Sequence, residues 1–263
     1  MIDLHIHTNI SPDGKEPIEN YVHIATQRGL KIIGFTEHWD FDRWDENAEF
    51  TVHTRSEAVC RAYKGPIEVL FGAELAYHPQ YKSQVEKYMD EVCPDYVLGS
   101  IHEVEGYMIT ELEETGQYFE KYGKKGFGMF FDAVGRFAQD GLFDVLGHLD
   151  VIKRFSVLYE FPFVLERYKD AIKDILKVLI KREKGMEINT SGLRQAPGSP
   201  YPGLQVVKWF FDLGGKYLTI GSDSHDSETV GFGSDTVISK LQQMGIIDFT
   251  IYRKRVPISL NII

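Results

Sequence analysis

The chain has very little cysteine: Cys60 and Cys93 are the only two among 263 residues, and they stand far apart in no CxxC pair. This scarcity argues against a disulfide framework and a cysteine-based zinc site, and it suits a reducing cytoplasm. No apolar run approaches the roughly 20 residues of a transmembrane helix, so we expect no membrane partner. Asp3, His5 and His7 interrupt the first residues, where a signal peptide needs an apolar core. We therefore predict a cytoplasmic protein.

Basic residues are also in short supply. The chain has 29 Lys and Arg against 39 Asp and Glu, which gives a formal net charge of −10. Such an acidic protein repels nucleic-acid backbones and anionic membranes unless it carries a local basic patch. We therefore predict that it binds no nucleic acid. The sequence leaves a homodimer open.

The composition excludes disorder, because 43% of the residues are hydrophobic and 13% are aromatic. No internal repeat, low-complexity tract or Pro/Gly/Ser-rich linker divides the chain. The Gly- and Pro-rich stretch at residues 191–203 is short enough to be a loop. We expect a single domain over residues 1–263, a length that α/β barrels often have.

Short apolar or alternating runs, each followed by a turn signal, predict seven strands. They lie near Ile2–His7, Lys31–Thr36, Glu68–Glu74, Tyr96–His102, Asp144–His148, Met186–Asn189 and Tyr217–Ser222. Helical patterns separate them, near Pro17–Arg28, Thr54–Tyr63, Gln80–Glu91, Gln117–Gln139, Pro162–Arg182, Leu204–Leu213 and Ser234–Met244. Strand–helix alternation implies parallel strands with right-handed crossovers. We predict an α/β fold, a distorted (β/α)7 TIM-like barrel.

Polar residues gather at the C-terminal ends of these strands, where α/β barrels build their active sites. Six of the nine histidines lie there. Each alone could be a hydrogen-bonded core or turn residue. So many imidazoles and carboxylates converging on one barrel mouth would destabilise it without cations. The candidate metal ligands are His5, His7, Asp13, His38, Glu74, His102, His148, Asp223 and His225.

Histidine and carboxylate ligands without thiolates suit Zn²⁺, Mn²⁺ or Fe. These candidates are too many for one tetrahedral ion, and they suffice for two or three if a carboxylate such as Glu74 bridges. Multi-metal clusters are the usual solution for phosphoester hydrolysis, because metals activate water and neutralise developing charge. The chain has no Walker A loop and no HExxH motif.

Seven ordered segments carry a more specific pattern: Asp3–Thr8, Phe35–His38, Gly72–Glu74, Gly99–His102, Gly147–Asp150, Glu187–Arg194 and Gly221–His225. In this order the chain resembles the PHP (polymerase and histidinol phosphatase) superfamily over nearly its whole length. The sequence Glu-Ile-Asn-Thr-Ser-Gly-Leu-Arg at 187–194 and the following Pro-Tyr-Pro favour the histidinol-phosphatase branch.

The resemblance implies a trinuclear metal site at the C-terminal face of the barrel. Its three ligand sets would be His5, His7, Glu74 and Asp223; then Glu74, His102 and His148; then Asp13, His38 and His225. Several relatives carry His where this chain has Asp13, a change that would weaken the third site or alter its metal preference.

The reaction that the resemblance implies is hydrolysis of L-histidinol phosphate to L-histidinol and phosphate, in histidine biosynthesis. A metal-bridging hydroxide would attack phosphorus in line, without a covalent enzyme intermediate. Glu74, Asp223 and His225 are the catalytic candidates. The proton for the leaving alkoxide could come from His225, Asp223 or a metal-bound water.

Three basic residues are candidates for binding the phosphomonoester substrate. Arg194 is the first, because a guanidinium binds phosphoryl oxygens bidentately; the alternative is a surface arginine that caps the 191–203 loop. Lys153 and Arg154 follow His148 closely, and we expect one to reach the mouth and the other to be solvated.

Further polar residues have weaker claims. Glu103, Glu105 and Glu111 could receive the substrate amine, although loop glutamates are more often simply solvated. We expect His23 on a helix and His53 in a loop. His78 is the one remaining histidine with a chance of touching the substrate.

Three alternatives compete with this hypothesis. Another PHP phosphoesterase, acting on phosphotyrosine proteins or nucleotide phosphates, would have a similar metal site. An amidohydrolase-type barrel often uses a carboxylated lysine at a strand end, where this chain has Glu74 and His102. A non-catalytic PHP scaffold would have lost ligands, whereas all nine positions here retain residues able to bind metal.

Overall fold

One parallel sheet organises the chain. The computed structural model describes residues 1–40 and 46–261, and of residues 46–51 the backbone alone. The strand order is β1-β2-β3-β4-β7-β8-β9, so spatial order follows the chain. The strands are β1 (Ile2–Ile6), β2 (Ile32–Asp40), β3 (Glu68–Ala76), β4 (Tyr96–Ser100), β7 (Val145–Leu146), β8 (Gly185–Asn189) and β9 (Leu218–Gly221).

The sheet nearly closes into a barrel, as predicted. Just beyond β9, Asp223 donates its backbone N–H to the His5 carbonyl, and His7 donates to the Ser224 carbonyl, each over 2.8 Å. The barrel is distorted, because the β1–β2 register shifts between Asp3 and Ile6 and β7 has only 2 residues. Most strand residues are buried, as expected for parallel strands covered on both faces.

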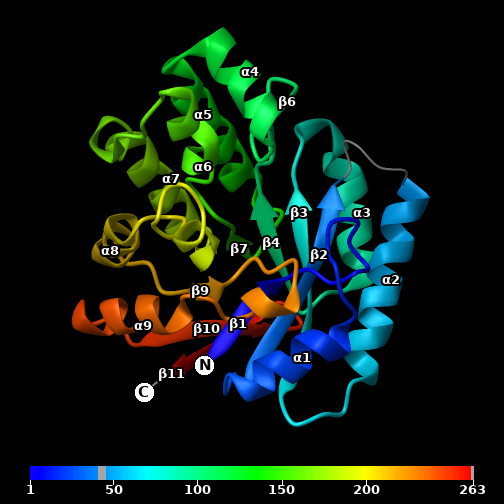
Figure 1. The fold of residues 1–263 in the computed structure, drawn as a ribbon. Helices are drawn as coiled ribbons and strands as arrows, with labels where there is room; N and C mark the ends of the chain where they lie inside the picture. The colour runs from blue at the N-terminus through cyan, green and yellow to red at the C-terminus, as the bar shows by residue number, and fades with distance from the viewer. Residues whose placement is uncertain (41–45, 262–263) are drawn as a thin grey trace.

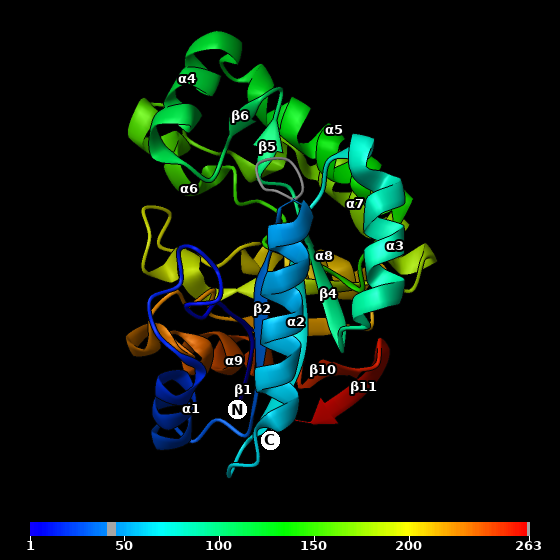
Figure 2. The ribbon, with the colours of Figure 1, turned by 90° about the vertical axis from the view of Figure 1, so that its right-hand side faces the viewer.

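Helices surround the sheet (Figure 1). They are α1 (Ile18–Gln27), α2 (Glu46–Ala62), α3 (Lys82–Val92), α4 (Leu112–Tyr122), α5 (Lys125–Asp140), α6 (Lys153–Ser156), α7 (Lys169–Lys181), α8 (Leu204–Asp212) and α9 (Ser234–Gln243). Figure 2 shows α2 and α3 in front of the strands, with α4, α5 and α6 gathered beyond one end of the sheet. None of the helices in the described ranges is both long and apolar enough to cross a membrane.

Three predicted helices differ from the structure, and the first of them, predicted from Thr54, already begins at Glu46 in α2. The pattern at Gln117–Gln139 predicts one helix, but α4 ends at Tyr122 and α5 begins at Lys125. Gly123 separates them with a φ of 56°, a positive value that glycine adopts without steric cost. The helix predicted from Pro162 starts only at Lys169, after a short 3₁₀ turn at Leu165–Arg167.

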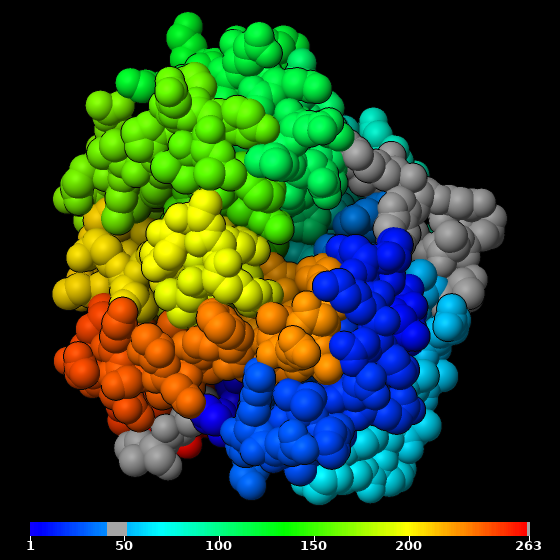
Figure 3. Space-filling view, in the orientation of Figure 1, coloured from blue at the N-terminus to red at the C-terminus, as the bar shows by residue number. Residues whose placement is uncertain are grey.

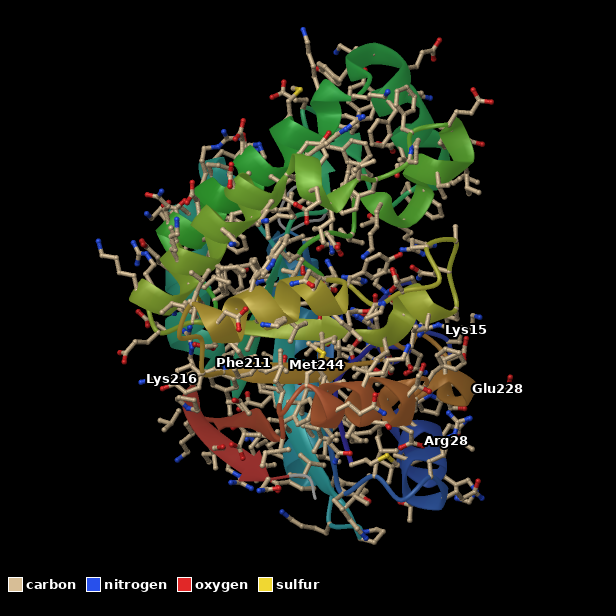
Figure 4. The ribbon with its side chains drawn as sticks, turned by 90° about the vertical axis from the view of Figure 1, so that its left-hand side faces the viewer. Lys15, Arg28, Phe211, Lys216, Glu228 and Met244 are labelled. Atoms are coloured by element: carbon tan, nitrogen blue, oxygen red, sulfur yellow. The ribbon has the colours of Figure 1, made fainter. Side chains whose placement is uncertain are left out.

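The structure adds two antiparallel hairpins that the sequence analysis did not predict: β5 (Glu103–Val104) with β6 (Tyr107–Met108), and β10 (Asp248–Arg253) with β11 (Val256–Asn261). Arg255 docks the second hairpin by bonding to Asp144 at the N-terminal end of β7. Figure 4 shows this hairpin beside α9, which ends one residue before the labelled Met244. The hairpin therefore lies at the end of the barrel opposite the C-terminal strand ends.

Candidate metal centre

A cavity of about 650 Å³ opens at the C-terminal ends of the strands. The segments that border it come from distant parts of the chain and meet on the face seen in Figure 3. Most of the predicted site residues line it, namely Asp13, His38, Glu74, His102, His148, Arg154, Arg194, Asp223 and His225. His5 and His7 are absent from its lining, and both are fully buried.

The first group of candidate ligands joins β1, β3 and the turn after β9. His5 Nε2 and His7 Nε2 are 3.1 Å apart, and Glu74 Oε2 lies 3.4 Å from each of them. Asp223 Oδ1 lies 3.7 Å from both nitrogens. These four atoms thus face one another around a common point, as the first predicted ligand set requires.

The second group forms around the other oxygen of the same carboxylate. Glu74 Oε1 is 2.8 Å from His148 Nε2 and 3.2 Å from His102 Nε2. Ser100 Oγ also donates to this oxygen, over 2.7 Å. Glu74 therefore lies between the first and second groups, in the position that a bridging carboxylate would need.

The third group lies closest to solvent. Asp13 Oδ2 is 3.2 Å from His38 Nε2 and 3.0 Å from His225 Nε2. The ring of His7 stacks on both imidazoles, with centroids 4.2 Å from His38 and 4.3 Å from His225. The Asp13 side chain is 52% exposed, whereas Glu74 is 1% exposed, so this group is the most open of the three.

Charge and burial oppose one another throughout this cluster. Burial favours the neutral form of Glu74, yet the charges of His5 and His102 hold its pKa well below the usual range. Burial likewise disfavours a charged His5, but Glu187 and Glu74 raise its pKa. For His7, burial and the neighbouring His38 lower the pKa well below its usual value. The imidazoles therefore cannot all be protonated together.

The donor set fits divalent metal ions. His5 Nε2 and His7 Nε2 are in contact, and His7 Nδ1 is buried without a hydrogen-bond partner. Imidazole nitrogens and carboxylate oxygens, with no thiolate, suit Zn²⁺, Mn²⁺ and Fe. Each such ion would take the place of the protons that otherwise separate these closely spaced nitrogen and oxygen atoms.

Three buried carboxylates within the strands, Asp3, Glu37 and Glu187, escaped the sequence analysis as site residues. Asp3 accepts from the backbone N–H groups of Ser222 and Gly231, over 2.8 and 2.7 Å. These bonds hold the turn that presents Asp223, whose φ is 54°. An acidic residue inside a short apolar strand was the available signal, because such a residue is costly unless it is bonded.

Glu37 supports the other end of the site. It accepts from the hydroxyl and backbone N–H of Thr8 and from the backbone N–H of Ser11. These bonds anchor the loop that leads to Asp13. The position of this exposed candidate ligand therefore depends on the buried Glu37 carboxylate.

Arg194 lines the cavity but does not cap the 191–203 loop. Its Nη1 donates to the Ser222 carbonyl over 2.7 Å and its Nη2 to the Asp223 carbonyl over 2.8 Å. A guanidinium has five N–H donors, so others remain for a ligand. Arg194 is thus attached to the same turn that carries Asp223.

Arg154 and Lys153 have different environments. Arg154 lines the cavity, and its Nε is buried without a hydrogen-bond partner. Lys153, predicted to reach the mouth or to be solvated, does neither. Its Nζ is buried and donates to Asp150 Oδ2 over 2.8 Å and to the Pro200 carbonyl over 2.9 Å. We therefore withdraw Lys153 as a substrate ligand, because its ammonium group ties α6 to the 191–203 loop.

The residues with weaker claims to bind the substrate also differ in whether they line the cavity. Of the three loop glutamates, only Glu111 lines the cavity. Asp40, which the sequence analysis did not consider, lines it too, because β2 runs further than expected. His78 does not line it and instead accepts from the Gln80 backbone N–H.

The last two histidines lie on helices. His23 lies exposed on α1, as expected. The prediction that His53 lies in a loop is wrong. His53 lies in α2 and is fully buried against Trp39, with ring centroids 5.0 Å apart. Burial lowers the pKa of His53 to about 4.

Comparisons with known proteins point to one family. The PHP domain family model matches residues 3–191. The chain is 31% identical to a probable histidinol-phosphatase of Clostridium acetobutylicum over 236 residues, 88% of this chain and 89% of the relative. It is 27% identical to the histidinol-phosphatase of Lactococcus lactis subsp. lactis over 231 residues, 85% and 84% of the two chains.

A solved structure shares the fold. The crystal structure of histidinol phosphate phosphatase from Lactococcus lactis, complexed with zinc, L-histidinol and phosphate, superposes with a TM-score of 0.82. The alignment covers 98% of each chain at 23% identity. The nearly closed seven-stranded barrel is therefore an established architecture.

Proposed function

Because the chain belongs to the PHP domain family, we propose that it hydrolyses L-histidinol phosphate to L-histidinol and phosphate, as the names of its curated relatives suggest. The first four relatives share 26 to 31% identity with it, over at least 85% of its length. The Lactococcus structure, with zinc, L-histidinol and phosphate bound, belongs to a protein of the same fold.

One observation carries the proposal: the cavity joins a metal-fitting cluster, two arginines and three further carboxylates, Asp40, Glu111 and Asp226. Arg154 and Arg194 suit the phosphoryl oxygens, because guanidinium groups bind such oxygens in bidentate fashion. Asp40 and Glu111 suit the cationic amine of the substrate. A volume of about 650 Å³ lies within the usual range for a small-molecule site.

The residues proposed to hold metal ions are the three groups described above. They are His5, His7, Glu74 and Asp223; Glu74, His102 and His148; and Asp13, His38 and His225. Zn²⁺, Mn²⁺ or Fe held there would lower the pKa of water and neutralise charge on the phosphoryl oxygens.

The turn after β9 supplies the two candidates for moving a proton to the leaving alkoxide. Although burial favours its neutral form, the charges of His5 and His225 hold the pKa of Asp223 below its usual range. Burial opposes a charged His225, but its bond to Asp13 and the charge of Asp223 raise its pKa. Asp223 is therefore suited to stay ionised and to hold a metal ion, whereas His225 would have to give up its proton to do the same.

Phosphate release from L-histidinol phosphate tests the proposal directly. The comparison panel contains phosphotyrosine, nucleotide and sugar phosphates, with Zn²⁺, Mn²⁺ and Fe²⁺ each added back to metal-depleted protein. We expect kcat/KM on L-histidinol phosphate to exceed all others by at least 100-fold. Weak or broad hydrolysis, or a preference for phosphotyrosine, would support a metal-dependent phosphoesterase but contradict L-histidinol phosphate as its substrate. Turnover that is unchanged without metal would overturn the metal mechanism itself.

A further inference from the structure

Glu187 is a buried carboxylate for which neither the family pattern nor the proposed reaction supplies a role. It lies in the middle of β8 and is 1% exposed. Within the described part of the chain, its one ion-pair partner is His5, and no Lys or Arg pairs with it. A buried carboxylate is costly unless it is paired and hydrogen-bonded, so its contacts should explain why it is there.

Those contacts reach two of the proposed metal groups. Glu187 Oε1 lies 2.7 Å from His5 Nδ1, on the ring edge opposite the Nε2 that faces Glu74. Glu187 Oε2 accepts from the His148 backbone N–H over 2.9 Å and from Asn189 Nδ2 over 3.3 Å. One carboxylate thus connects β1, β8 and the turn after β7.

The neighbouring strand leaves room for this pair. A Cβ placed on Gly221 of β9 would lie 2.6 Å from Glu187 Oε1 and 2.3 Å from His5 Cβ. Real Cβ atoms do not approach other atoms so closely, so any side chain at Gly221 would displace the carboxylate or the imidazole. The Glu187–His5 contact therefore requires glycine at position 221.

We propose that Glu187 is a positioning residue for the metal centre: it accepts the Nδ1 proton of His5 and so leaves the His5 Nε2 lone pair for an ion. A carboxylate that holds the far nitrogen of an imidazole fixes its tautomer and orientation and makes it a more basic ligand. Its bond to the His148 backbone fixes the position of a second candidate ligand, His148 itself. This role rests on the metal centre of the proposed function.

The test is metal affinity, measured on metal-depleted protein by competition with a chelator for Zn²⁺. Glu187→Gln keeps the size of the side chain and removes its charge. Because one Gln oxygen cannot accept both the His5 and His148 protons, we expect Zn²⁺ to bind about 10- to 100-fold more weakly, the usual effect of losing such a support. The visible absorption of Co²⁺-substituted protein should change as well, since the geometry at His5 changes.

Asp144→Asn is the matched control. Asp144 is also a buried carboxylate beside β7, but it accepts from Val97 N and Arg255 at the other end of the strands. The control should lower the melting temperature and leave Zn²⁺ affinity and the Co²⁺ spectrum unchanged. If Glu187→Gln does not fold, Glu187→Asp takes its place, because the shorter side chain keeps its charge and loses the reach to His5.

The outcomes separate the two proposals. Wild-type affinity and an unchanged Co²⁺ spectrum in the Glu187 variant would overturn the positioning role and leave the metal centre intact. A wild-type protein that takes up no divalent ion would overturn the metal centre and, with it, the role of Glu187. Weaker Zn²⁺ binding in Glu187→Gln but not in Asp144→Asn would support the proposal.

Discussion

At the scale of single residues, one side chain holds the site together. Glu74 gives one oxygen to His5 and His7 and the other to His102 and His148. At 1% exposure the carboxylate is buried, so solvent screens these contacts only weakly. Each of the other candidate ligands belongs to one of the proposed groups, so the loss of Glu74 should disturb at least two proposed groups at once.

Glu74→Gln should therefore lower kcat/KM on the order of 1,000-fold or more, since removing part of an electrostatic framework typically costs ~10²–10³ and here at least two of the proposed metal groups are affected. The bound metal, measured by elemental analysis, should fall with the activity. Glu68→Gln is the control, because Glu68 begins the same strand and pairs with Arg253 at its other end. Full metal content and activity in the Glu74 variant would contradict the bridging position.

Arg154 and Lys153 give a second prediction. Arg154→Ala should lower kcat/KM by about 10- to 100-fold, as expected for losing ~1.5–3 kcal/mol of charged hydrogen bonds to phosphate, with little change in melting temperature. Lys153→Ala should do the reverse, because it leaves the buried Asp150 carboxylate without its ammonium partner. Kinetics and thermal unfolding of both variants check this, and a Lys153 variant with normal stability but a raised KM would restore it as a substrate ligand.

The sequence could predict the strand-end ligands because each follows a short apolar run that parallel strands bring to one edge. It could not choose between Lys153 and Arg154, since both lie in the 4-residue helix α6, too short to show a periodic pattern. Nor could it place Glu111 in the cavity, because the β5–β6 hairpin and the start of α4 are positioned by tertiary contacts. Asp3 and Glu187 were not identified as site residues because their partners lie far away along the chain.

At the scale of elements, the β10–β11 hairpin is fastened to the base of the barrel by two arginines with unequal burial. Arg255 bonds to Asp144, which is 7% exposed, through its Nε and Nη2. Arg253 pairs with Glu68 in a more exposed position, at 47% and 35% exposure. Both are arginine–carboxylate pairs, so comparing them shows how burial affects the contribution of such a pair to stability.

Arg255→Ala should destabilise the protein by about 1–3 kcal/mol, because it leaves the Asp144 carboxylate buried with fewer partners. Arg253→Ala should cost only ~0–1 kcal/mol, the usual value for an exposed ion pair. Urea unfolding of both variants measures this, and neither should change kcat at 25 °C, because the hairpin lies opposite the cavity. Equal losses of stability would show that burial does not distinguish the pairs.

At the scale of the whole molecule, the net charge of −10 and the small cavity favour a small-molecule substrate over a macromolecule. We maintain as predictions that the chain acts as a single domain over residues 1–263, works in the cytoplasm and binds no nucleic acid. Light scattering of the purified protein would decide between a monomer and the homodimer that the sequence leaves open.

Raising the pH should lower the stability of the metal-free protein and increase the stabilisation that Zn²⁺ provides. Although burial disfavours a charged His102, Glu74 and Asp40 raise its pKa to about 9, above its usual value of 6.5. The stability that protonated His102 contributes is therefore complete below pH 6.5 and is lost as pH rises through 9. The pKa values of His5 and His38 are raised too, so their contributions change in the same direction.

Metal binding needs these same imidazoles deprotonated, so the affinity for Zn²⁺ should rise over that pH range. We expect the melting temperature of metal-free protein to fall between pH 6.5 and 9, while the increase on adding Zn²⁺ grows. Thermal unfolding at several pH values, with and without Zn²⁺, measures both quantities. His53, whose pKa is lowered to about 4, loses its contribution only below pH 6.5, outside this window. A Zn²⁺-induced increase that shrinks as pH rises would contradict the assignment of these histidines as the groups that exchange protons for metal.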